Sequence, residues 1–151
     1  MNIFVYGSLI IPQVMRRVTG RSFSSEEAFL RGYAQFRLKD EADAALIPFP
    51  DKETDGVVYY DVDEETAGRL DAFAGARFER IEVNVETEGR AWVEAQTHIL
   101  RRAQRKRLAT EPWDELKFRS RDMDAFLRSP SLPTPPPSTA AGRAAKPTRR
   151  P

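Results

Sequence analysis

The architecture of this chain is set by a stretch near its start, Asn2-Ile3-Phe4-Val5-Tyr6-Gly7-Ser8-Leu9. Apolar side chains occupy both odd and even positions within residues 2–6, a pattern typical of an interior strand that is covered on both faces. Gly7 stops the strand and permits a tight turn, so the backbone N–H groups that follow it lack partners in the sheet. Residues 6–9 are therefore a candidate cradle for an anion or a carbonyl oxygen, although an ordinary turn reads the same way.

Further strands are indicated along the chain. The run from Val57 to Tyr60 has the β-branched and aromatic composition of a strand, and residues 81–86 alternate apolar and polar side chains. Gly89 is placed to make the turn of a hairpin. The expected strands are residues 27–38 (one or two strands, bent at Gly32), 45–48, 55–62, 78–87 and 91–100.

A helix is predicted between Asp63 and Gly75. Asp63 is a favoured N-cap, acidic residues follow it in the first turn, and Gly75 is suited to end the helix. One face of this helix carries Ala67, Leu70, Phe73 and Ala74, and it is expected to pack inward. Two more helices are expected, at residues 12–18 and at residues 112–128. The apolar anchors of the last helix would be Trp113, Leu116, Phe126 and Leu127. Helices interspersed among strands predict an α+β domain around a small curved or closed sheet.

Composition excludes several classes of protein. The 151 residues suit one domain, and 40% hydrophobic with 31% charged residues suit a globule with a core. Zero cysteines exclude disulfides and thiolate chemistry, and the single histidine, His98, excludes a site with two imidazoles. No apolar run reaches the roughly 18 residues of a membrane span. The N-terminus also lacks the pattern of a signal peptide, so a cytoplasmic location is expected.

The last residues differ from the rest in composition. Residues 129–151 hold seven of the 11 prolines and four basic residues, with no acidic or aromatic residue. Such a segment buries too little apolar surface to offset its ordering entropy, so it is expected to be a disordered tail. The predicted division is a domain over residues 1–128 and a Pro-rich tail over residues 129–151. Four scattered bases favour a solubilising extension over a nucleic-acid or membrane contact.

Seven short motifs occur in an order that resembles the gamma-glutamyl cyclotransferase-like family, which includes avirulence-induced-gene-like proteins and gamma-glutamylamine cyclotransferases. The resemblance extends over residues 1–128. The motifs are Tyr6-Gly7-Ser8-Leu9, the stretch from Gly32-Tyr33 to Arg37-Leu38, Ala45-Leu46-Ile47-Pro48, Gly56-Val57-Val58-Tyr59, Leu70-Asp71-x-Phe73, Phe78-Glu79-Arg80 and Glu111-Pro112-Trp113-Asp114.

The resemblance implies a small mixed β-barrel with flanking helices. It also implies a reaction in which the α-amine of a gamma-glutamyl amide attacks the δ-carbonyl, giving 5-oxoproline and a free amine. The partner would be a small gamma-glutamyl compound, and no metal or other cofactor is implied. Substrate would be held largely by main-chain groups of the loop formed by Tyr6, Gly7, Ser8 and Leu9. A glutamate at the end of the helix would move the proton, since burial brings the pKa of a carboxyl closer to neutral pH.

The chain departs from the family pattern at that glutamate. The pattern is Leu-Asp-x-x-Glu-Gly, whereas this chain has Leu70-Asp71-Ala72-Phe73-Ala74-Gly75. Ala74, at the catalytic position, has no titratable group, so an impaired enzyme is expected. Two smaller departures are Asp43-Ala44, where many relatives have an aromatic residue and proline, and Phe78, which replaces a tyrosine.

Two interpretations remain open at this point. In one, the chain is a gamma-glutamyl cyclotransferase with reduced activity, and Asp71, three residues before Ala74, is a candidate substitute base. In the other, the chain is a non-enzymatic module that binds a gamma-glutamyl compound or another small carboxylate. His98 is interpreted as a packed histidine. The basic residues between Arg101 and Arg107 are interpreted as a solvated surface, so nucleic acid is not the expected partner.

Overall fold

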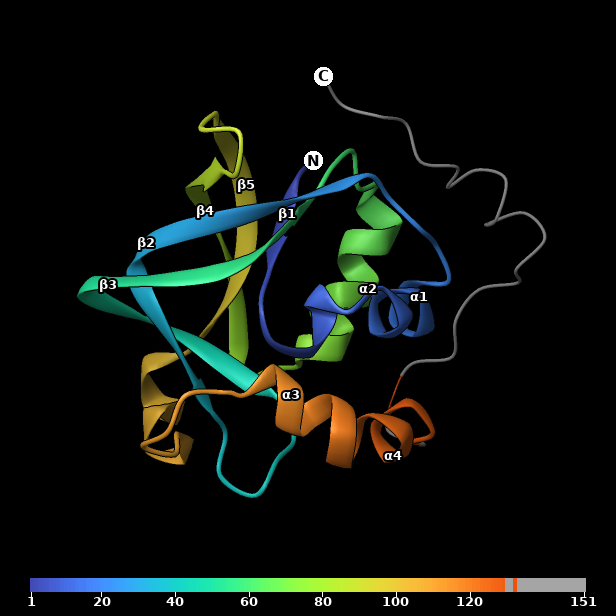
Figure 1. The fold of residues 1–151 in the computed structure, drawn as a ribbon, viewed down its shortest axis with the longest axis vertical. Coiled ribbons are helices and arrows are strands. Elements are labelled where there is room, and N and C mark those ends of the chain that lie inside the picture. The colour runs from blue at the N-terminus through green and yellow to red at the C-terminus, as the bar shows by residue number, and fades with distance from the viewer. Residues whose placement is uncertain (130–131, 133–151) are drawn as a thin grey trace.

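The protein is an α+β fold around a closed five-stranded barrel (Figure 1). The computed structural model describes residues 1–129 and 132. The strands follow the order β1-β3-β2-β4-β5 around the barrel. Their bounds are β1 Ile3–Val5, β2 Ser25–Arg37, β3 Ala44–Tyr59, β4 Phe78–Thr87 and β5 Trp92–Leu100. The predicted small barrel with flanking helices is confirmed.

The shortest strand closes the barrel. Residues of β1 pair antiparallel with β3, from Ile3 opposite Tyr59 to Val5 opposite Val57. On its other side β1 pairs parallel with β5, at Ile3 opposite Gln96. All three β1 side chains are at most 2% exposed, which confirms the expectation of an interior strand.

One long strand replaces two that the sequence predicts separately. Residues 45–48 and 55–62 were expected as two pieces, but β3 runs without a break from Ala44 to Tyr59. Pro48 and Pro50 are tolerated because β1 pairs only with Val57–Tyr59. The proline half of β3 therefore has a ladder on one side only, which is where a sheet accepts residues that lack an N–H.

The partner strand β2 is one strand with an irregularity near its middle. Its register against β3 shifts between Arg31 and Tyr33, on either side of Gly32, whose φ is 86°. The expected bend at Gly32 is thus confirmed. The long β2–β3 pair curves across the front of the barrel in Figure 1 and ends beside α3.

Two helices cover one side of the barrel. They are α1, Pro12–Thr19, and α2, Glu64–Ala74. The Asp63 side chain caps α2 by accepting a hydrogen bond from the Thr66 amide at 3.1 Å, as predicted. Gly75 ends the helix with φ 86°, and its amide donates a hydrogen bond to the main-chain carbonyl oxygen of Asp71. The expected boundaries of α2 are therefore confirmed at both ends.

The C-terminal helical segment starts later and is less regular than the sequence suggests. It comprises α3 Glu115–Lys117, a π-helical turn Phe118–Asp122 and α4 Met123–Leu127. Asp114 accepts hydrogen bonds from the amides of Leu116 and Lys117, which fixes the start after Asp114. Leu116 is 76% exposed, so its prediction as an anchor was wrong. Phe118 packs inward instead, with its ring 5.6 Å from that of Trp113.

The predicted tail lies almost wholly outside the described residues. Its described members are Ser129 and Leu132, and the amide of Leu132 donates to the Ser129 carbonyl at 3.2 Å. Leu132 is 9% exposed and belongs to the core cluster that contains Trp113 and Phe118. The division after residue 128 stays a prediction.

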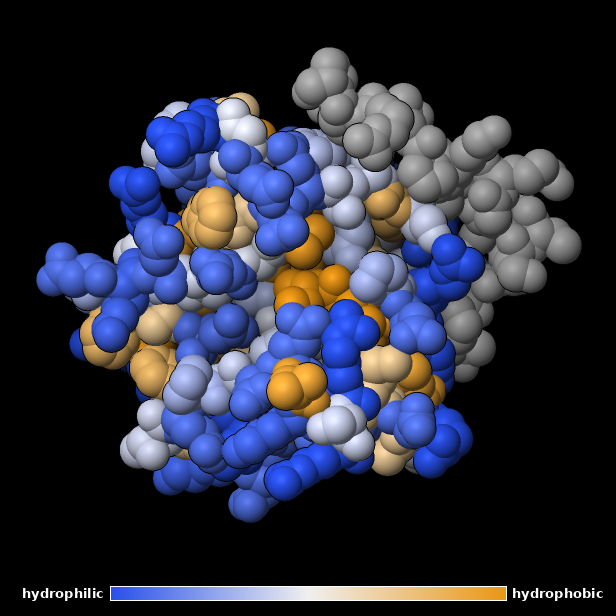
Figure 2. Space-filling view, in the orientation of Figure 1, coloured by the Kyte–Doolittle hydropathy of each residue, from blue (hydrophilic) through white to orange (hydrophobic). Residues whose placement is uncertain are grey.

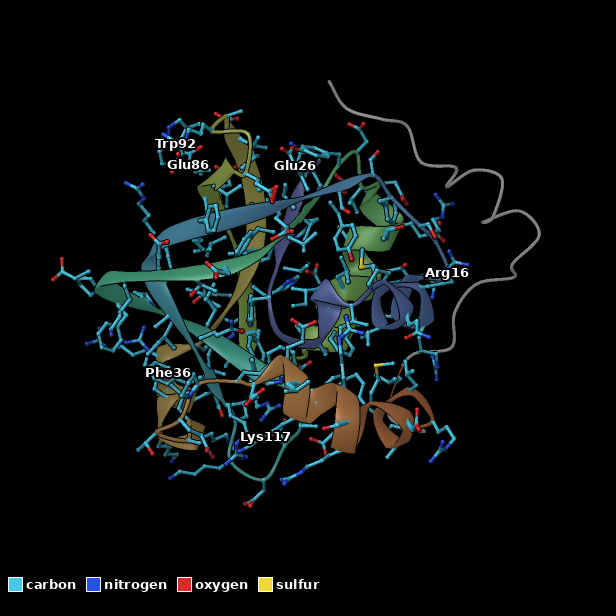
Figure 3. All side chains as sticks on the ribbon, in the orientation of Figure 1. Arg16, Glu26, Phe36, Glu86, Trp92 and Lys117 are labelled. Carbon is cyan, nitrogen blue, oxygen red and sulfur yellow. The ribbon has the colours of Figure 1, made fainter. Side chains whose placement is uncertain are left out.

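Polar residues cover most of the outer surface in the view of Figure 2, with apolar side chains gathered near its centre. At the end of the barrel away from α3, Glu86 and Trp92 lie beside each other on β4 and β5 (Figure 3). Arg31 contacts both, by an ion pair of 3.1 Å with Glu86 and by stacking over Trp92. Within residues 1–129 and 132, no helix has the length and apolarity needed to cross a membrane.

Gly56→Ala tests how closely β1 and β3 approach each other. A Cβ at Gly56 would lie 2.2 Å from the Val5 carbonyl oxygen and 2.6 Å from the Phe4 ring. Overpacking typically costs about 1–3 kcal/mol, so we expect the free energy of unfolding, measured in urea, to fall by at least about 1 kcal/mol. The control is Gly68→Ala in α2, where a Cβ meets nothing within 4 Å. It should gain roughly 0.5–1 kcal/mol, and equal stability of the two variants would contradict the close approach.

Candidate functional site

A cavity of about 380 Å³ opens where β1 ends, between the C-terminus of α2 and the start of β3. Its volume lies in the range of small-molecule sites, roughly 300–1,000 Å³. Apolar side chains form much of its wall. The residues that matter for its chemistry are Tyr6, Leu9, Glu41, Asp43, Ala74, Arg77 and His98.

The loop after β1 contributes two of its four predicted residues to the cavity wall. Tyr6 and Leu9 line the cavity, whereas Gly7 and Ser8 are buried behind them. Gly7 has φ 62°, a left-handed conformation that glycine adopts without strain. A Cβ at Gly7 would also lie 2.7 Å from Asp43 Oδ1, so the residue is excluded from carrying a side chain on two grounds.

Asp43 binds this loop directly. Its Oδ1 accepts hydrogen bonds from the Ser8 amide at 2.9 Å and from the Ala44 amide at 2.8 Å. Its Oδ2 lies 2.5 Å from the Ser8 hydroxyl, which donates to it. The Ser8 donors that the sequence assigned to a ligand are thus occupied by a carboxyl group of the chain itself.

The Asp43 carboxyl is desolvated although it faces a cavity. Burial raises its pKa above the usual aspartate value, and the negative charge of Glu41 adds to this. The hydrogen bonds from Ser8 and Ala44 act in the opposite direction but do not outweigh burial. Such a carboxyl binds and releases a proton closer to neutral pH than an exposed one does.

Tyr6 is held in place by main-chain groups. Its hydroxyl donates to the His98 carbonyl oxygen at 2.8 Å. Burial and the nearby Asp43 charge raise the pKa of Tyr6. The phenol therefore stays neutral at physiological pH, and its hydroxyl proton is used in the hydrogen bond to the main-chain carbonyl oxygen of His98.

Ala74 is the last residue of α2, and its methyl group lines the same cavity as Asp43. The expectation that the helix face carrying Ala74 packs inward agrees with this placement. The wall contributed by the helix end is apolar there, since Phe73 and Gly75 flank Ala74.

Asp71, the candidate substitute base, lies outside this cavity wall. Its Oδ1 is 2.7 Å from His98 Nε2 and 3.3 Å from Arg80 Nε. These contacts place it on the outer side of the helix, in a shallow depression shared with Arg80 and Arg101. The structure therefore does not bring Asp71 together with Ala74 at the cavity.

His98 is a packed histidine, only 8% exposed. Burial lowers the pKa of His98, while the hydrogen bond and charge of Asp71 counteract that shift. The imidazole is therefore neutral at pH 7, and its Nε2 atom is engaged by Asp71 rather than directed at a ligand.

An ion pair closes one side of the cavity. Arg77 Nη1 and Nη2 bind Glu41 Oε2 and Oε1 at 2.8 and 3.0 Å. This bidentate pair raises the pKa of Arg77 and leaves both side chains with a charged partner. Within the described residues, no group of three or more acidic or histidine side chains is arranged to hold a metal ion.

Sequence reasoning missed three of the polar residues at the cavity, Glu41, Asp43 and Arg77. A signal existed for Asp43, because Asp43-Ala44 departs from the aromatic–proline pair of the family pattern. No motif marked Glu41 or Arg77, which are joined only by the fold.

Two solved structures have a similar architecture. A solution structure of an Arabidopsis thaliana protein matches with a TM-score of 0.65 and 25% identity, over 84% of this chain and 77% of that one. A protein described as gamma-glutamyl cyclotransferase matches in fold, with a TM-score of 0.58 and 19% identity over 66% of each chain.

The family model described as gamma-glutamyl cyclotransferase, AIG2-like, matches residues 3–115, and the chain belongs to this family. AIG2-like protein A of Arabidopsis thaliana is 33% identical over 87 residues, which are 58% of this chain and 53% of that protein. The match thus spans about half of that relative's length. AIG2-like protein C of the same organism is 27% identical over 127 residues, 83% of this chain and 73% of that protein.

Asp71→Asn tests the assignment of His98. The carboxylate of Asp71 raises the pKa of His98 against the effect of burial, so its removal should lower that pKa further. An NMR titration of the imidazole Cε1–H measures this without ambiguity, because the chain has one histidine. Glu82→Gln, an exposed change on β4, should leave the pKa of His98 unchanged. An unchanged or higher pKa in Asp71→Asn would contradict the contact.

The lowered pKa of His98 in the folded chain also makes its stability depend on pH. Because the pKa of folded His98 lies below the unfolded value of about 6.5, the unfolded chain takes up this proton first as the pH falls. The contribution of His98 to the free energy of unfolding is therefore present above about pH 6.5 and is lost as the pH falls through the folded pKa.

Proposed function

We propose that the cavity binds the glutamyl part of a gamma-glutamyl amide and that the chain converts it slowly to 5-oxoproline and a free amine. The observation that carries this proposal is that Tyr6 and Leu9, from the loop after β1, line one cavity together with Ala74, from the end of α2. Membership of the family supplies the reaction class. The partner is then a small molecule, and the cytoplasmic location expected from the sequence is consistent with it.

Ring closure depends mainly on geometry. The α-amine and the δ-carbonyl belong to the same molecule, so the protein needs to fold the substrate into a reactive conformation rather than supply a nucleophile. A concave site with a rigid wall supports that requirement. Leu9 and Tyr6 are fixed by the barrel, because Tyr6 bonds to β5 and the Leu9 carbonyl accepts a hydrogen bond from Tyr59 at 3.1 Å.

The slow rate follows from position 74. The α-amine is an ammonium ion near neutral pH and must lose a proton before it attacks, and the leaving nitrogen must gain one. A well-placed general acid–base group is typically worth about 10²–10⁴-fold. The methyl group of Ala74 supplies none of this, whereas a glutamate at the same position would extend into the cavity.

A non-enzymatic binding module is the second candidate function. The observation that favours it is the apolar wall at the end of α2, which suits retention of a ligand better than its turnover. In that case the cavity holds a gamma-glutamyl compound or a small carboxylate without changing it.

Ala74→Glu distinguishes the two functions. We expect the variant to release 5-oxoproline from L-γ-glutamyl-n-butylamide at least about 10²-fold faster than the parent chain, because it gains a proton carrier at the end of α2. Chromatographic assay of 5-oxoproline, with the uncatalysed rate subtracted, measures the difference. Ala74→Gln is the matched control and should stay at the parent rate, since it reproduces the shape without the titratable group. Tight ligand binding without turnover in Ala74→Glu would favour the non-enzymatic module.

Ligand binding is expected in the parent chain as well. Saturating 5-oxoproline should shift the backbone amide NMR signals of Leu9 and Ala74, which line the cavity from two different elements. The amide of Trp92, on the far end of the barrel, is the internal control and should not move. Unshifted Leu9 and Ala74 signals at saturating ligand would show that the cavity does not hold the glutamyl moiety.

A further inference from the structure

The titratable groups that line the cavity differ in their freedom to react. Within the described residues these groups belong to Tyr6, Glu41, Asp43, Arg77 and His98. Glu41 and Arg77 neutralise each other in a bidentate pair. Tyr6 has committed its proton to a carbonyl, and His98 binds Asp71. The carboxyl of Asp43 is the group at the cavity that has no opposite charge beside it.

The hydrogen bonds of Asp43 leave room for one more partner. A carboxylate offers about four lone-pair sites. Within the described part of the chain, Oδ1 uses two for the amides of Ser8 and Ala44, and Oδ2 uses one for the Ser8 hydroxyl. Asp43 also lines the cavity, so a ligand there would have to use the remaining site on Oδ2.

We propose that Asp43 is the proton carrier of this chain, so that the carboxylate missing at the end of α2 is supplied from the start of β3. The inference rests on the function proposed above, which requires a gamma-glutamyl amide in the cavity. The Ser8 contacts hold the carboxyl beside the loop that the substrate faces. The negative Asp43 carboxylate beside this loop attracts the α-ammonium group of the substrate. Backbone N–H groups without partners would instead attract the α-carboxylate of the substrate.

The reaction balances with Asp43 as the only carrier. The α-ammonium first loses one proton to solvent, and the amine attacks the δ-carbonyl carbon to form the ring C–N bond. The carbonyl π electrons move to oxygen, and Asp43 accepts the second proton from the ring nitrogen. The tetrahedral intermediate then collapses, the exocyclic C–N bond breaks, and the leaving nitrogen takes the proton from Asp43. Asp43 ends as the carboxylate it was at the start.

The charges around Asp43 suit this role. Tyr6 faces it from the end of β1, Glu41 and Arg77 from the rim, and His98 lines the cavity from β5. Tyr6 and His98 are neutral at pH 7, and the Glu41–Arg77 pair has no net charge. Burial then dominates and raises the pKa of Asp43, which brings it toward the pH at which a carrier works best.

Asp43→Asn tests the proposal, because the amide is isosteric and preserves the structural contacts. Its oxygen can accept from the amides of Ser8 and Ala44, and its nitrogen can donate to the Ser8 hydroxyl. A merely structural role predicts an unchanged rate. We expect kcat for L-γ-glutamyl-n-butylamide to fall by at least about tenfold. The control Glu82→Gln, which removes an exposed carboxylate on β4 away from the cavity, should keep the parent rate. A loss in Asp71→Asn but not in Asp43→Asn would overturn the proposal.

Rescue at position 74 separates this proposal from the proposed function. In the Ala74→Glu background, Asp43→Asn should lower kcat by less than about threefold, because a second carrier is present. A parent chain that releases 5-oxoproline above the uncatalysed rate, with an unchanged kcat in Asp43→Asn, would overturn the role of Asp43 and leave the proposed function intact. No turnover in the parent chain would contradict the proposed function itself.

The dependence of kcat on pH gives an independent readout. The α-ammonium of the substrate makes kcat decline toward acid pH in every variant. The parent chain should show a further, steeper decline with a midpoint above the ordinary aspartate value of about 3.9, and Asp43→Asn should lack this additional decline. Where Asp43→Asn does not fold, the presence of the steeper decline in the parent profile decides alone. A parent kcat whose decline does not steepen between about pH 7 and pH 4 would overturn the proposal.

Discussion

Closure of the barrel by three residues is the constraint on which the site depends. Ile3–Val5 pair with β3 on one side and with β5 on the other, and without them the sheet would stay open. The approach is so close that Gly56 has no room for a methyl group beside Val5. Because β1 is short, the chain leaves the barrel wall at Tyr6 and turns at Gly7 while still in the interior. The cavity wall therefore begins where the closing strand ends.

The elements with local signals were predictable from the sequence. Asp63 and Gly75 bound α2 because capping acts through neighbouring residues, and Gly32 bends β2 because its conformation is a property of glycine. The continuity of β3 through Pro48 was not predictable in this way. It depends on β1 being too short to pair with that half of the strand, which is a property of the closed barrel. Leu116 was misassigned because the π-helical turn after it changes the faces of the last helix.

The candidate site likewise contains residues that local sequence signals predict and residues that only the fold brings together. Tyr6 and Leu9 belong to a motif whose order among the others indicates the family, and Ala74 stands directly after the Leu70-Asp71-x-Phe73 motif. The structure brings all three to one cavity. Asp43 stands 31 positions before Ala74 in the chain and belongs to another wall, so no spacing rule connects the two. Its meeting with Ser8 is a long-range contact that the β1–β3 ladder does not supply, because β1 pairs with Val57–Tyr59 at the other end of β3. Asp71 was a reasonable candidate by sequence distance, yet the turn of the helix directs it to His98 and Arg80 instead.

Ala74 and Asp43 illustrate two different requirements of a reaction in this cavity, the shape of its wall and a group that carries a proton. Reactive conformations are imposed by the shape of the wall, whereas a proton can be taken up from any side that reaches the reacting nitrogen. The wall depends on Gly7, Tyr6 and the closing strand, and a change in these would disturb the core. A carboxyl group is less constrained, since a desolvated pocket raises its pKa wherever it lies in that pocket. Ala74 and Asp43 lie on different walls of one cavity, so a carboxyl group on either wall would face the same space.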